Sequence, residues 1–396
     1  MKITDVECTV LLATDVDAEA CSSAQDDVVV RVYTDEGLVG VGETDANPWA
    51  VKALIDSPGT HCMGRGLREM LVGEDPMQTH ALWHKLYMGS AMNGRRGLGI
   101  CAIGALDMAL WDLRGKAEGK PVWAVLGGAC QAALTPYASL LPEGRTLVEY
   151  RENLVAKARQ ALRLGFRALK IEVCIKGPYS HMGLQQENDD IADVVGAVRG
   201  AVGGDTTLMI DVAYAWRDYK EALSVLRRLE QYDPFFVETP LPSDDLDGYA
   251  RLADATGIRI AAGEWLTSRY EFFDLIDRGR IDVAQPDVGR VGGLTEARRV
   301  VEYAEDRGRL VVPHCWKTGI GIAASAHLCV TAASAPFFEF LPASLAESAL
   351  RRELVAEEFP LVDGRIPLPH KPGLGIELNE EALVRYRART SALIPH

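Results

Sequence analysis

TLMID, at residues 207–211, is the first of four short runs that decide the fold of this chain, and FFVE (235–238), IAAGE (260–264) and VAQPD (283–287) follow it. Each run resembles a buried strand and ends in one acidic residue. Two further runs, VVPH (311–314) and FFEF (337–340), carry a histidine and a glutamate. These charged positions recur about every 25 residues, and a segment of helical period fills each gap. The rhythm predicts a (β/α) barrel.

The parallel strands of such a barrel point their carboxyl ends into one shared pocket. Residues that are far apart in the sequence therefore converge there. The residues expected at this mouth are Asp211, Glu238, Glu264, Asp287, His314 and Glu339. Their convergence makes the mouth of the barrel the candidate active site.

The barrel pattern occupies only part of the 396 residues, which exceed the usual length of one domain. Residues 27–44 alternate like two strands joined by a turn, and helical patterns follow them. We expect an α+β capping domain over residues 1–128 and the barrel over residues 129–343. The Pro- and Gly-rich residues 344–396 are predicted to return to the capping domain.

The composition of the chain limits the kinds of molecule that it can bind. The formal charge of −14 argues against nucleic acid and against an anionic membrane surface. No apolar run reaches the roughly 18 residues that span a bilayer. The eight cysteines are scattered singly without a CxxC pair, which is typical of reduced thiols. We therefore expect a cytoplasmic protein that acts on a small molecule.

Asp211, Glu238 and Glu264 end three consecutive runs. Each acid alone could cap a helix or form an ion pair. Three carboxylates brought together, however, repel and raise one another's pKa unless a cation neutralises them. Hard oxygen ligands in this number suit Mg²⁺ and leave coordination positions for water and substrate. The spacing therefore favours a magnesium site.

Asp287 and His314 end the next two runs. Neighbouring strand ends can bring a carboxylate within hydrogen-bonding distance of an imidazole. The carboxylate then fixes the histidine tautomer and raises the basicity of the outer nitrogen. A lone histidine is more often structural, but this setting favours an acid–base pair.

Further motifs surround these residues: MIDVAYAW (209–216), VETPLP (237–242), AAGEW (261–265), QPDVGRVGG (285–293), VVPHCW (311–316) and the long stretch 93–128. In this order and spacing the chain resembles the mandelate racemase-like subgroup of the enolase superfamily over nearly its whole length. The resemblance implies a modified (β/α)₇β barrel with an N-terminal α+β cap.

The same resemblance implies roles for the strand-end residues. Mg²⁺ would lie on Asp211, Glu238 and Glu264, and His314 with Asp287 would form the acid–base dyad. Glu339 would donate or accept a hydrogen bond at the substrate carboxylate or the developing enolate. A proton α to a carboxylate is too weakly acidic for a side-chain base unless a divalent ion stabilises the ene-diolate.

The chain departs from the family pattern in the strand across from His314. Relatives carry Lys-x-Lys there with the second lysine as a base, whereas this chain reads Lys170-Ile171-Glu172. Position 213, an asparagine or histidine in many relatives, is Ala213. Glu172 could transfer protons itself, His314 could do all the acid–base work, or Lys170 and Glu172 could form an ion pair that only orients substrate.

Position alone identifies the residues that could line the pocket, because they follow strand ends. They are Trp216, Trp265, Trp316, Lys317, Lys176, Tyr179 and His181. By analogy with the family, residues 18–25 of the cap would cover the pocket. This segment is small and polar, which disfavours an aryl substrate.

We expect a Mg²⁺-dependent dehydratase of a sugar acid, an aldonate or aldarate, with His314 as general base and acid. An epimerase, or a cycloisomerase that opens a sugar lactone or anhydro-sugar acid, is the close alternative. The stretch HCWKTGIGIAA after residue 313 resembles cycloisomerase members. A non-catalytic barrel is the distant alternative. By family analogy we also expect a homo-oligomer, from dimer to octamer.

Overall fold

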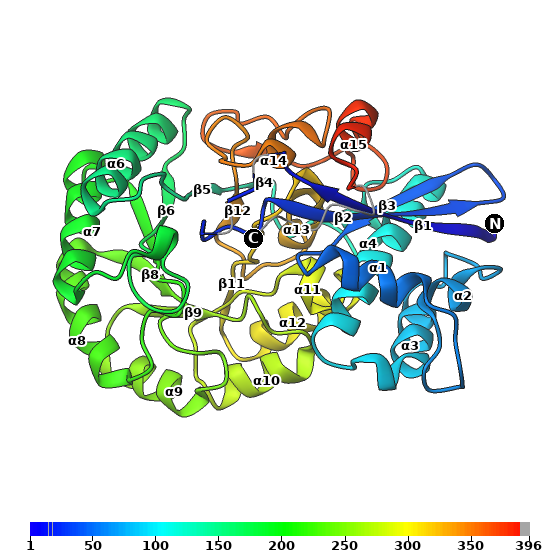
Figure 1. The fold of residues 1–396 in the computed structure, drawn as a ribbon, viewed down its shortest axis with the longest axis horizontal. Helices are drawn as coiled ribbons and strands as arrows, with labels where there is room; N and C mark the ends of the chain where they lie inside the picture. Colours follow the sequence, from blue (N-terminus) through cyan, green and yellow to red (C-terminus); the bar gives the residue numbers. More distant parts are fainter. Residues whose placement is uncertain (15, 18, 389–396) are drawn as a thin grey trace.

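The charged strand ends lie on one curled sheet of eight parallel strands in the computed structural model, which describes residues 1–14, 16–17 and 19–388 (Figure 1). The strand order is β11-β10-β9-β8-β7-β6-β5-β12. The strands are β5 (Pro136–Leu140), β6 (Ala168–Glu172), β7 (Thr207–Asp211), β8 (Pro234–Glu238), β9 (Arg259–Ala262), β10 (Val283–Ala284), β11 (Leu310–Val311) and β12 (Phe338–Phe340).

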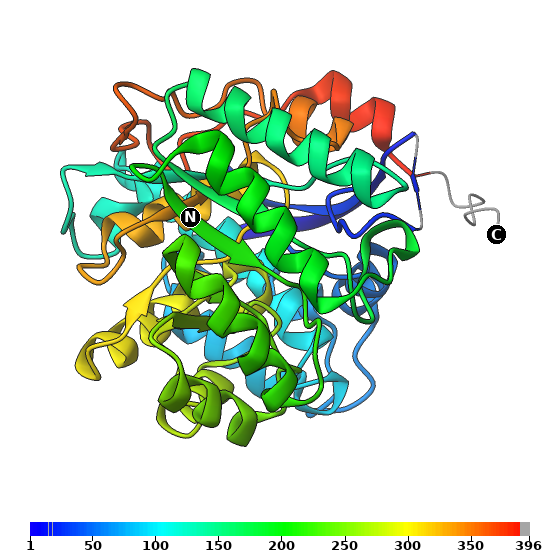
Figure 2. The ribbon, with the colours of Figure 1, turned by 90° about the vertical axis from the view of Figure 1, so that its left-hand side faces the viewer.

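Helices connect these strands along the outside of the sheet, and Figure 2 shows α6 to α9 side by side on the outer face. They are α6 (Leu147–Arg163), α7 (Asn188–Val202), α8 (Tyr219–Leu229), α9 (Leu246–Ala255), α10 (Arg269–Asp277), α11 (Val288–Val291), α12 (Leu294–Asp306) and α13 (Gly319–Val330), with the short 3₁₀ turns η2 (His181–Gly183) and η3 (Glu230–Tyr232). Seven strand–helix units and a final strand confirm the predicted modified (β/α)₇β barrel.

Local sequence explains why these helices form where they do. Thr146 caps α6 in a reciprocal capping box with Glu149, which satisfies two backbone N–H groups of the first turn. Helix α8 buries Ala222, Val225, Leu226 and Leu229, a spacing that places one apolar stripe against the sheet. Burial of such stripes, rather than helix propensity, holds the outer ring on the barrel.

The interior of the barrel is apolar at the end opposite the charged strand ends. Its side chains form one buried cluster of Tyr137, Ala168, Met209, Phe236, Ala261, Val283 and Val312. The first six of these residues come one each from the strands β5 to β10, and Val312 follows β11. This apolar layer fills the barrel below the charged residues of the mouth.

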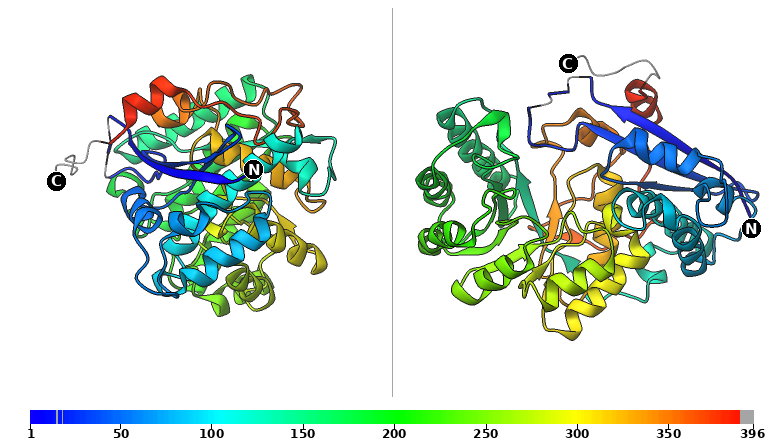
Figure 3. Two further views of the ribbon diagram at one scale, coloured as in Figure 1. Left: turned by 90° about the vertical axis from the view of Figure 1, so that its right-hand side faces the viewer. Right: turned by 60° about the horizontal axis from the view of Figure 1, so that its bottom comes forward.

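The N-terminal part forms the predicted α+β cap. Strands β1 (Ile3–Leu12), β2 (Asp26–Thr34) and β3 (Val39–Glu43) pair as an antiparallel sheet. The helices that follow are α1 (Pro48–Asp56), α2 (Leu67–Leu71), α3 (Thr79–Gly89), the turn η1 (Ala91–Asn93), α4 (Leu98–Glu118) and α5 (Val122–Val125). Figure 3 shows this part beside the barrel, with α4 near α11.

Carboxylates of the cap also bind the barrel. Glu43, at the end of β3, accepts hydrogen bonds from the backbone N–H groups of Thr318 and Gly321 at the start of α13. The Thr318 hydroxyl donates to the same carboxylate. A negative charge at a helix N-terminus is stabilising. The cap is therefore joined to the barrel strand-to-helix loop that carries His314.

The C-terminal residues contact both parts. Strand β13 (Ile366–Pro367) pairs with β4 (Ala133–Leu134), just before the barrel begins. Two helices, α14 (Ala349–Glu353) and α15 (Glu380–Tyr386), follow one another on this segment, and Ala388 N donates to Val10 O of β1. The domain boundaries at residues 128 and 343 stay predictions. No helix within the described residues has the length and apolar character needed to cross a membrane.

Candidate active site

Three carboxylates meet at the mouth of the barrel. Asp211 ends β7, Glu238 ends β8, and Glu264 follows β9 by two residues. One carboxylate oxygen from each lies within 4.8 Å of the others, and all three side chains are buried. Asp211 is held by hydrogen bonds from Ala213 N (2.8 Å) and the Thr239 hydroxyl (2.7 Å) to its Oδ1. The cluster is therefore oriented by its surroundings.

The electrostatics of the cluster fit a cation. Burial raises the pKa of Glu238 the most; Lys170 opposes this effect and Asp211 adds to it, and together they bring the pKa to about 8. Glu238 Oε2 is buried without a hydrogen-bond partner among the described residues. Clustered carboxylate oxygens with an uncompensated acceptor are a donor set for a hard divalent ion. The residues present thus fit Mg²⁺.

Lys170 lies beneath this cluster and is completely buried. Its ammonium nitrogen is 3.0 Å from Glu238 and 2.8 Å from Glu339. It is farther from Glu172 (3.7 Å) and Asp211 (3.8 Å). Lys170 is therefore shared by four carboxylates rather than paired with Glu172.

His314 lies between Asp287 and the carboxylate cluster. Its Nδ1 is 2.8 Å from Asp287 Oδ2, and its Nε2 is 3.1 Å from Glu264 Oε2. Burial alone would lower the pKa of His314, but Glu264 and Asp287 outweigh burial and raise it to about 9. Asp287 Oδ1 also accepts from Arg290 N as the N-cap of α11, which fixes the carboxylate.

Glu172 occupies the side of the mouth across from His314. It is in register with Asp211 on the neighbouring strand, and the Ser139 hydroxyl donates to its Oε1 at 3.4 Å. Burial and Asp211 raise the pKa of Glu172, while Lys170 opposes them. The carboxylate form of Glu172 is therefore more basic than that of a solvent-exposed glutamate.

Glu339 is fully buried beneath the mouth. Its Oε2 accepts a hydrogen bond from Cys315 N at 2.8 Å, and its Oε1 faces Lys170. Burial opposes ionisation of Glu339, but Lys170 and His314 outweigh it and lower its pKa. The residue holds the loop after β11 as well as Lys170.

A pocket of about 530 Å³ opens above these groups. It is lined from the barrel by Lys170, Glu172, Asp211, Ala213, Glu264, Arg290 and His314, by Pro178–Ser180, Gly183, Tyr214, Trp265 and Trp316, and from the cap by Glu19–Ser23. The cap segment expected to cover the pocket does line it; its first residue, Ala18, lies outside the described residues. A second cavity of similar volume, between β3 and residues 371–380, contains no such cluster.

The structure corrects part of the expected pocket lining. Lys317 does not line the pocket, because its buried ammonium contacts the cap residues Asp26 (2.8 Å) and Asp45 (3.2 Å). His181 is buried and accepts a hydrogen bond from Cys21 N at 3.3 Å. Trp216 packs in the core, and Lys176 faces Glu221 at 3.7 Å. Of the expected lining residues, Trp265, Trp316 and Tyr179 remain.

The sequence did not identify several residues that line the pocket, among them Arg290 and Tyr214. Arg290 donates to the Glu264 backbone oxygen at 3.1 Å and forms an ion pair with Asp45 of the cap. Its position three residues after Asp287, inside the QPDVGRVGG motif, was an available signal. Tyr214 follows Ala213, and both have positive φ values of 59° and 44°. No sequence signal indicated that turn.

Comparison with known proteins agrees with this geometry. Residues 10–127 match the model of the mandelate racemase / muconate lactonizing enzyme N-terminal domain, and residues 153–382 match the enolase C-terminal domain-like model. The chain is 30% identical to a D-galactarolactone cycloisomerase of Agrobacterium fabrum over 91% of each chain. It is also 30% identical to a D-galactonate dehydratase of Pectobacterium atrosepticum over 90% of this chain and 89% of that one.

A solved structure extends the comparison to the metal. A racemase from Streptomyces coelicolor A3(2) with bound magnesium superposes with a TM-score of 0.82 at 26% identity, covering 98% of this chain and 100% of that one. The family models, the relatives and the barrel mouth agree on one conclusion. The chain belongs to the mandelate racemase / muconate lactonizing enzyme family of the enolase superfamily.

Proposed function

We propose that this protein is an enzyme that removes the proton α to the carboxylate of a sugar acid and then eliminates the substituent on the β carbon. The observation that carries the proposal is the position of His314. Its Nδ1 is held by Asp287 at 2.8 Å, and its Nε2 faces both the pocket and the carboxylate cluster. A base fixed in one tautomer beside a cation site suits this reaction.

Asp211, Glu238 and Glu264 are the proposed ligands of Mg²⁺, the ion bound by the magnesium-containing relative. When bound by these residues, Mg²⁺ would supply positive charge that stabilises the negative charge developing on the substrate. Lys170 keeps Glu238 and Glu339 in place. We further propose that Glu339 contributes through Lys170 and the Cys315 backbone rather than by direct contact, because it is fully buried and does not line the pocket.

His314 is the proposed general base and general acid. It takes the α proton at Nε2 and returns it to the departing oxygen on the β carbon, so it is ready for the next cycle. A one-sided mechanism of this kind needs no second base. Ala213 offers none.

Two leaving groups remain open. Dehydration of an aldonate or aldarate releases hydroxide as water, and the dehydratase relative acts on D-galactonate by name. Cycloisomerisation releases a ring oxygen, and the cycloisomerase relative acts on D-galactarolactone by name. Epimerisation requires a proton donor on the opposite face, for which Glu172 is the candidate. Cytoplasmic location and homo-oligomerisation stay predictions.

Incubation with sugar acids and their lactones in D₂O with Mg²⁺ tests the proposal. A 2-keto-3-deoxy product formed from an open-chain acid with loss of water indicates dehydration, the same type of product formed from a cyclic acid without loss of any atom indicates cycloisomerisation, and deuterium incorporated without elimination indicates epimerisation. We expect His314→Asn to lower kcat/KM by about 10²–10⁴-fold, the usual contribution of a positioned acid–base group. Full activity of this variant with the true substrate would contradict the assignment, and His327→Asn is a histidine control outside the pocket.

A further inference from the structure

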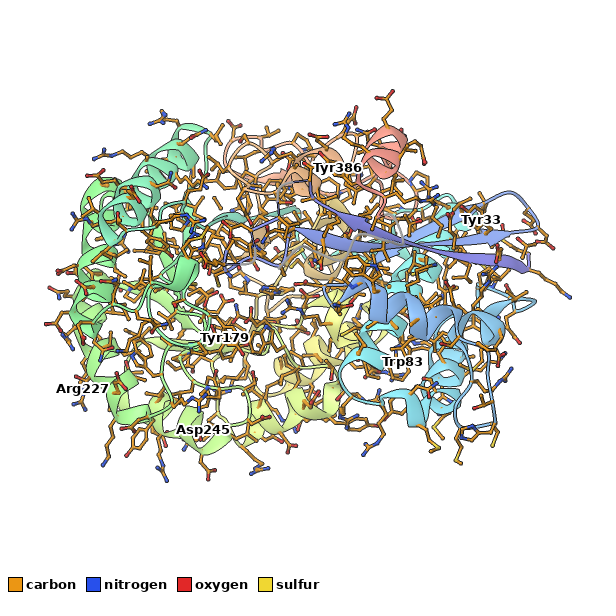
Figure 4. The ribbon with its side chains drawn as sticks, in the orientation of Figure 1. Tyr33, Trp83, Tyr179, Arg227, Asp245 and Tyr386 are labelled. Carbon is orange, nitrogen blue, oxygen red and sulfur yellow. The ribbon has the colours of Figure 1, made fainter. Side chains whose placement is uncertain are left out.

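Three aromatic rings form one wall of the pocket. The rings of Tyr214 and Trp265 stack with centroids 4.1 Å apart and an interplanar angle of 28°. Tyr179 meets Trp265 edge-on at 4.9 Å and 86°, and meets Tyr214 at 5.9 Å and 75°. All three residues line the pocket that contains His314 and the carboxylate cluster. Figure 4 labels Tyr179 on the segment between β6 and α7.

The wall is tied to the reacting end of the pocket. Tyr214 follows Asp211 by three residues, Trp265 follows Glu264, and Tyr214 N donates to Thr239 O at 2.7 Å. Tyr214 is buried behind the indole, so Trp265 and Tyr179 supply the accessible surface, at 40% and 44% exposure. An indole face this open, braced from behind by a buried ring, is a preformed surface for a ligand.

Several hydroxyl groups of the outer pocket already have hydrogen-bond partners. The Ser22 hydroxyl accepts from Trp316 Nε1 at 3.0 Å and donates to Glu347. The Ser23 hydroxyl donates to Asp45 at 2.9 Å. The Ser180 hydroxyl accepts from Gln185 at 2.7 Å. This part of the pocket therefore offers an aromatic surface beside serine hydroxyls that already have partners, and the buried Tyr214 hydroxyl has no hydrogen-bond partner among the described residues.

These features discriminate between two shapes of sugar acid. An open-chain acid presents hydroxyl groups along its whole length, and each buried hydroxyl without a partner is unfavourable. A five- or six-membered sugar ring instead presents a flat face of C–H groups, which packs on an aromatic ring. The second shape matches this wall.

We propose that Trp265 and Tyr179, braced by Tyr214, select a cyclic sugar acid whose ring oxygen is attached to the β carbon. The inference rests on the proposed function and narrows its leaving group. His314 takes the α proton, the electron pair of that C–H bond forms the Cα=Cβ bond, and the bond from Cβ to the ring oxygen breaks. The proton goes to the ring oxygen, and the enol becomes a 2-keto acid. No atom is gained or lost.

Steady-state kinetics with a matched pair of acids tests this selection. D-Galactarolactone is the ring form and D-galactarate is its open-chain counterpart. We expect the wild-type enzyme with Mg²⁺ to have the higher kcat/KM for the lactone. Trp265→Leu and Tyr179→Leu should each raise the KM for the lactone by about tenfold, the range of one aromatic contact, with a smaller change in kcat.

Tyr270→Leu is the matched control, since Tyr270 is 43% exposed but lies outside the pocket. This variant should leave the KM and the kcat for the lactone unchanged. Tyr179→Leu also guards against indirect effects, because Tyr179, unlike Trp265, is not adjacent in sequence to a carboxylate of the cluster. A higher kcat/KM for galactarate, or an unchanged KM for the lactone in both pocket variants, would overturn the selection of a ring.

Failure of the proposed function is a separate result. In that case wild-type protein with saturating Mg²⁺ would turn over no sugar acid and would incorporate no deuterium at the α carbon of any of them. Calorimetric titration of the same two acids then still tests the aromatic wall. Tighter binding of the lactone that weakens in Trp265→Leu supports the selection, whereas equal or weaker binding of the lactone overturns it.

Discussion

The two ends of the barrel interior differ in polarity: one is apolar and the other is charged. The closed end is the apolar cluster that contains Met209, Phe236 and Val283, and its packing stabilises the fold. The open end places Lys170 among four carboxylates, where burial raises the pKa of Glu238 to about 8. The same strands carry both ends. The closed end stabilises a scaffold on which the open end can hold charges that are unfavourable without a bound cation.

The largest effect on stability is expected from Lys170→Met. This change removes the one ammonium group from the buried carboxylates and should lower the free energy of unfolding by about 3–5 kcal/mol, as for one partner of a buried ion pair. Urea unfolding without Mg²⁺ measures it. Lys157→Met is the control: that buried lysine donates mainly to Leu141 O, and its loss should remove only about 1 kcal/mol. Equal losses in the free energy of unfolding in the two variants would contradict the role of Lys170 in stabilising the buried carboxylates.

A buried histidine outside the mouth predicts a smaller, pH-dependent effect. His327 on α13 accepts from Trp123 N and faces Leu374 O at 3.1 Å, and burial lowers its pKa from 6.5 to about 4. Its neutral form contributes stability above pH 6.5, and this contribution is lost as the pH falls towards 4. The loss amounts to about 3 kcal/mol.

His327→Gln can keep both hydrogen bonds without titrating. The stability of wild type relative to this variant should therefore fall by about 3 kcal/mol between pH 7 and pH 4. Chemical denaturation at the two pH values measures the difference, and carboxylates common to both proteins cancel. A difference independent of pH would show that His327 is not the titrating group.

The smallest effect is expected at the closed end. Val283→Ala removes two buried methyl groups from the apolar cluster and should lower the free energy of unfolding by about 2 kcal/mol. Because the change leaves the carboxylates in place, Mg²⁺ affinity should be unchanged. Parallel urea unfolding and Mg²⁺ titration check both statements. A fall in Mg²⁺ affinity comparable with that of Glu238→Gln would show that the two ends are not independent.

The sequence was sufficient to predict the barrel and the residues at its strand ends. A strand period and a recurring charge together specify where parallel strands end and that their ends converge. The capping box of α6 and the apolar stripe of α8 likewise depend on neighbours within a few residues, so these two helices could be predicted from the sequence. Strand-end residues are therefore predictable from local pattern alone.

Loop side chains were not predictable in the same way. Lys317 follows His314 closely, yet it contacts Asp45 in the cap rather than the pocket, because its partner lies in another part of the chain. Arg290 has the same cap partner and yet lines the pocket. An ion pair between Lys170 and Glu172 was one of the three possibilities, but Lys170 is closest to Glu339, from a strand far away in sequence. Long-range charge pairing decides each of these orientations.

The most direct test of the cation account is calorimetric titration of the metal-free protein with Mg²⁺, combined with thermal unfolding. We predict one ion bound per chain and a stabilisation of about 2.7 kcal/mol when free Mg²⁺ is 100 times its Kd. Asp211→Asn combined with Glu238→Gln should abolish both signals. Wild-type protein that binds no Mg²⁺, or a double variant that binds it as tightly as wild type, would contradict the assignment of Asp211, Glu238 and Glu264 as the metal site.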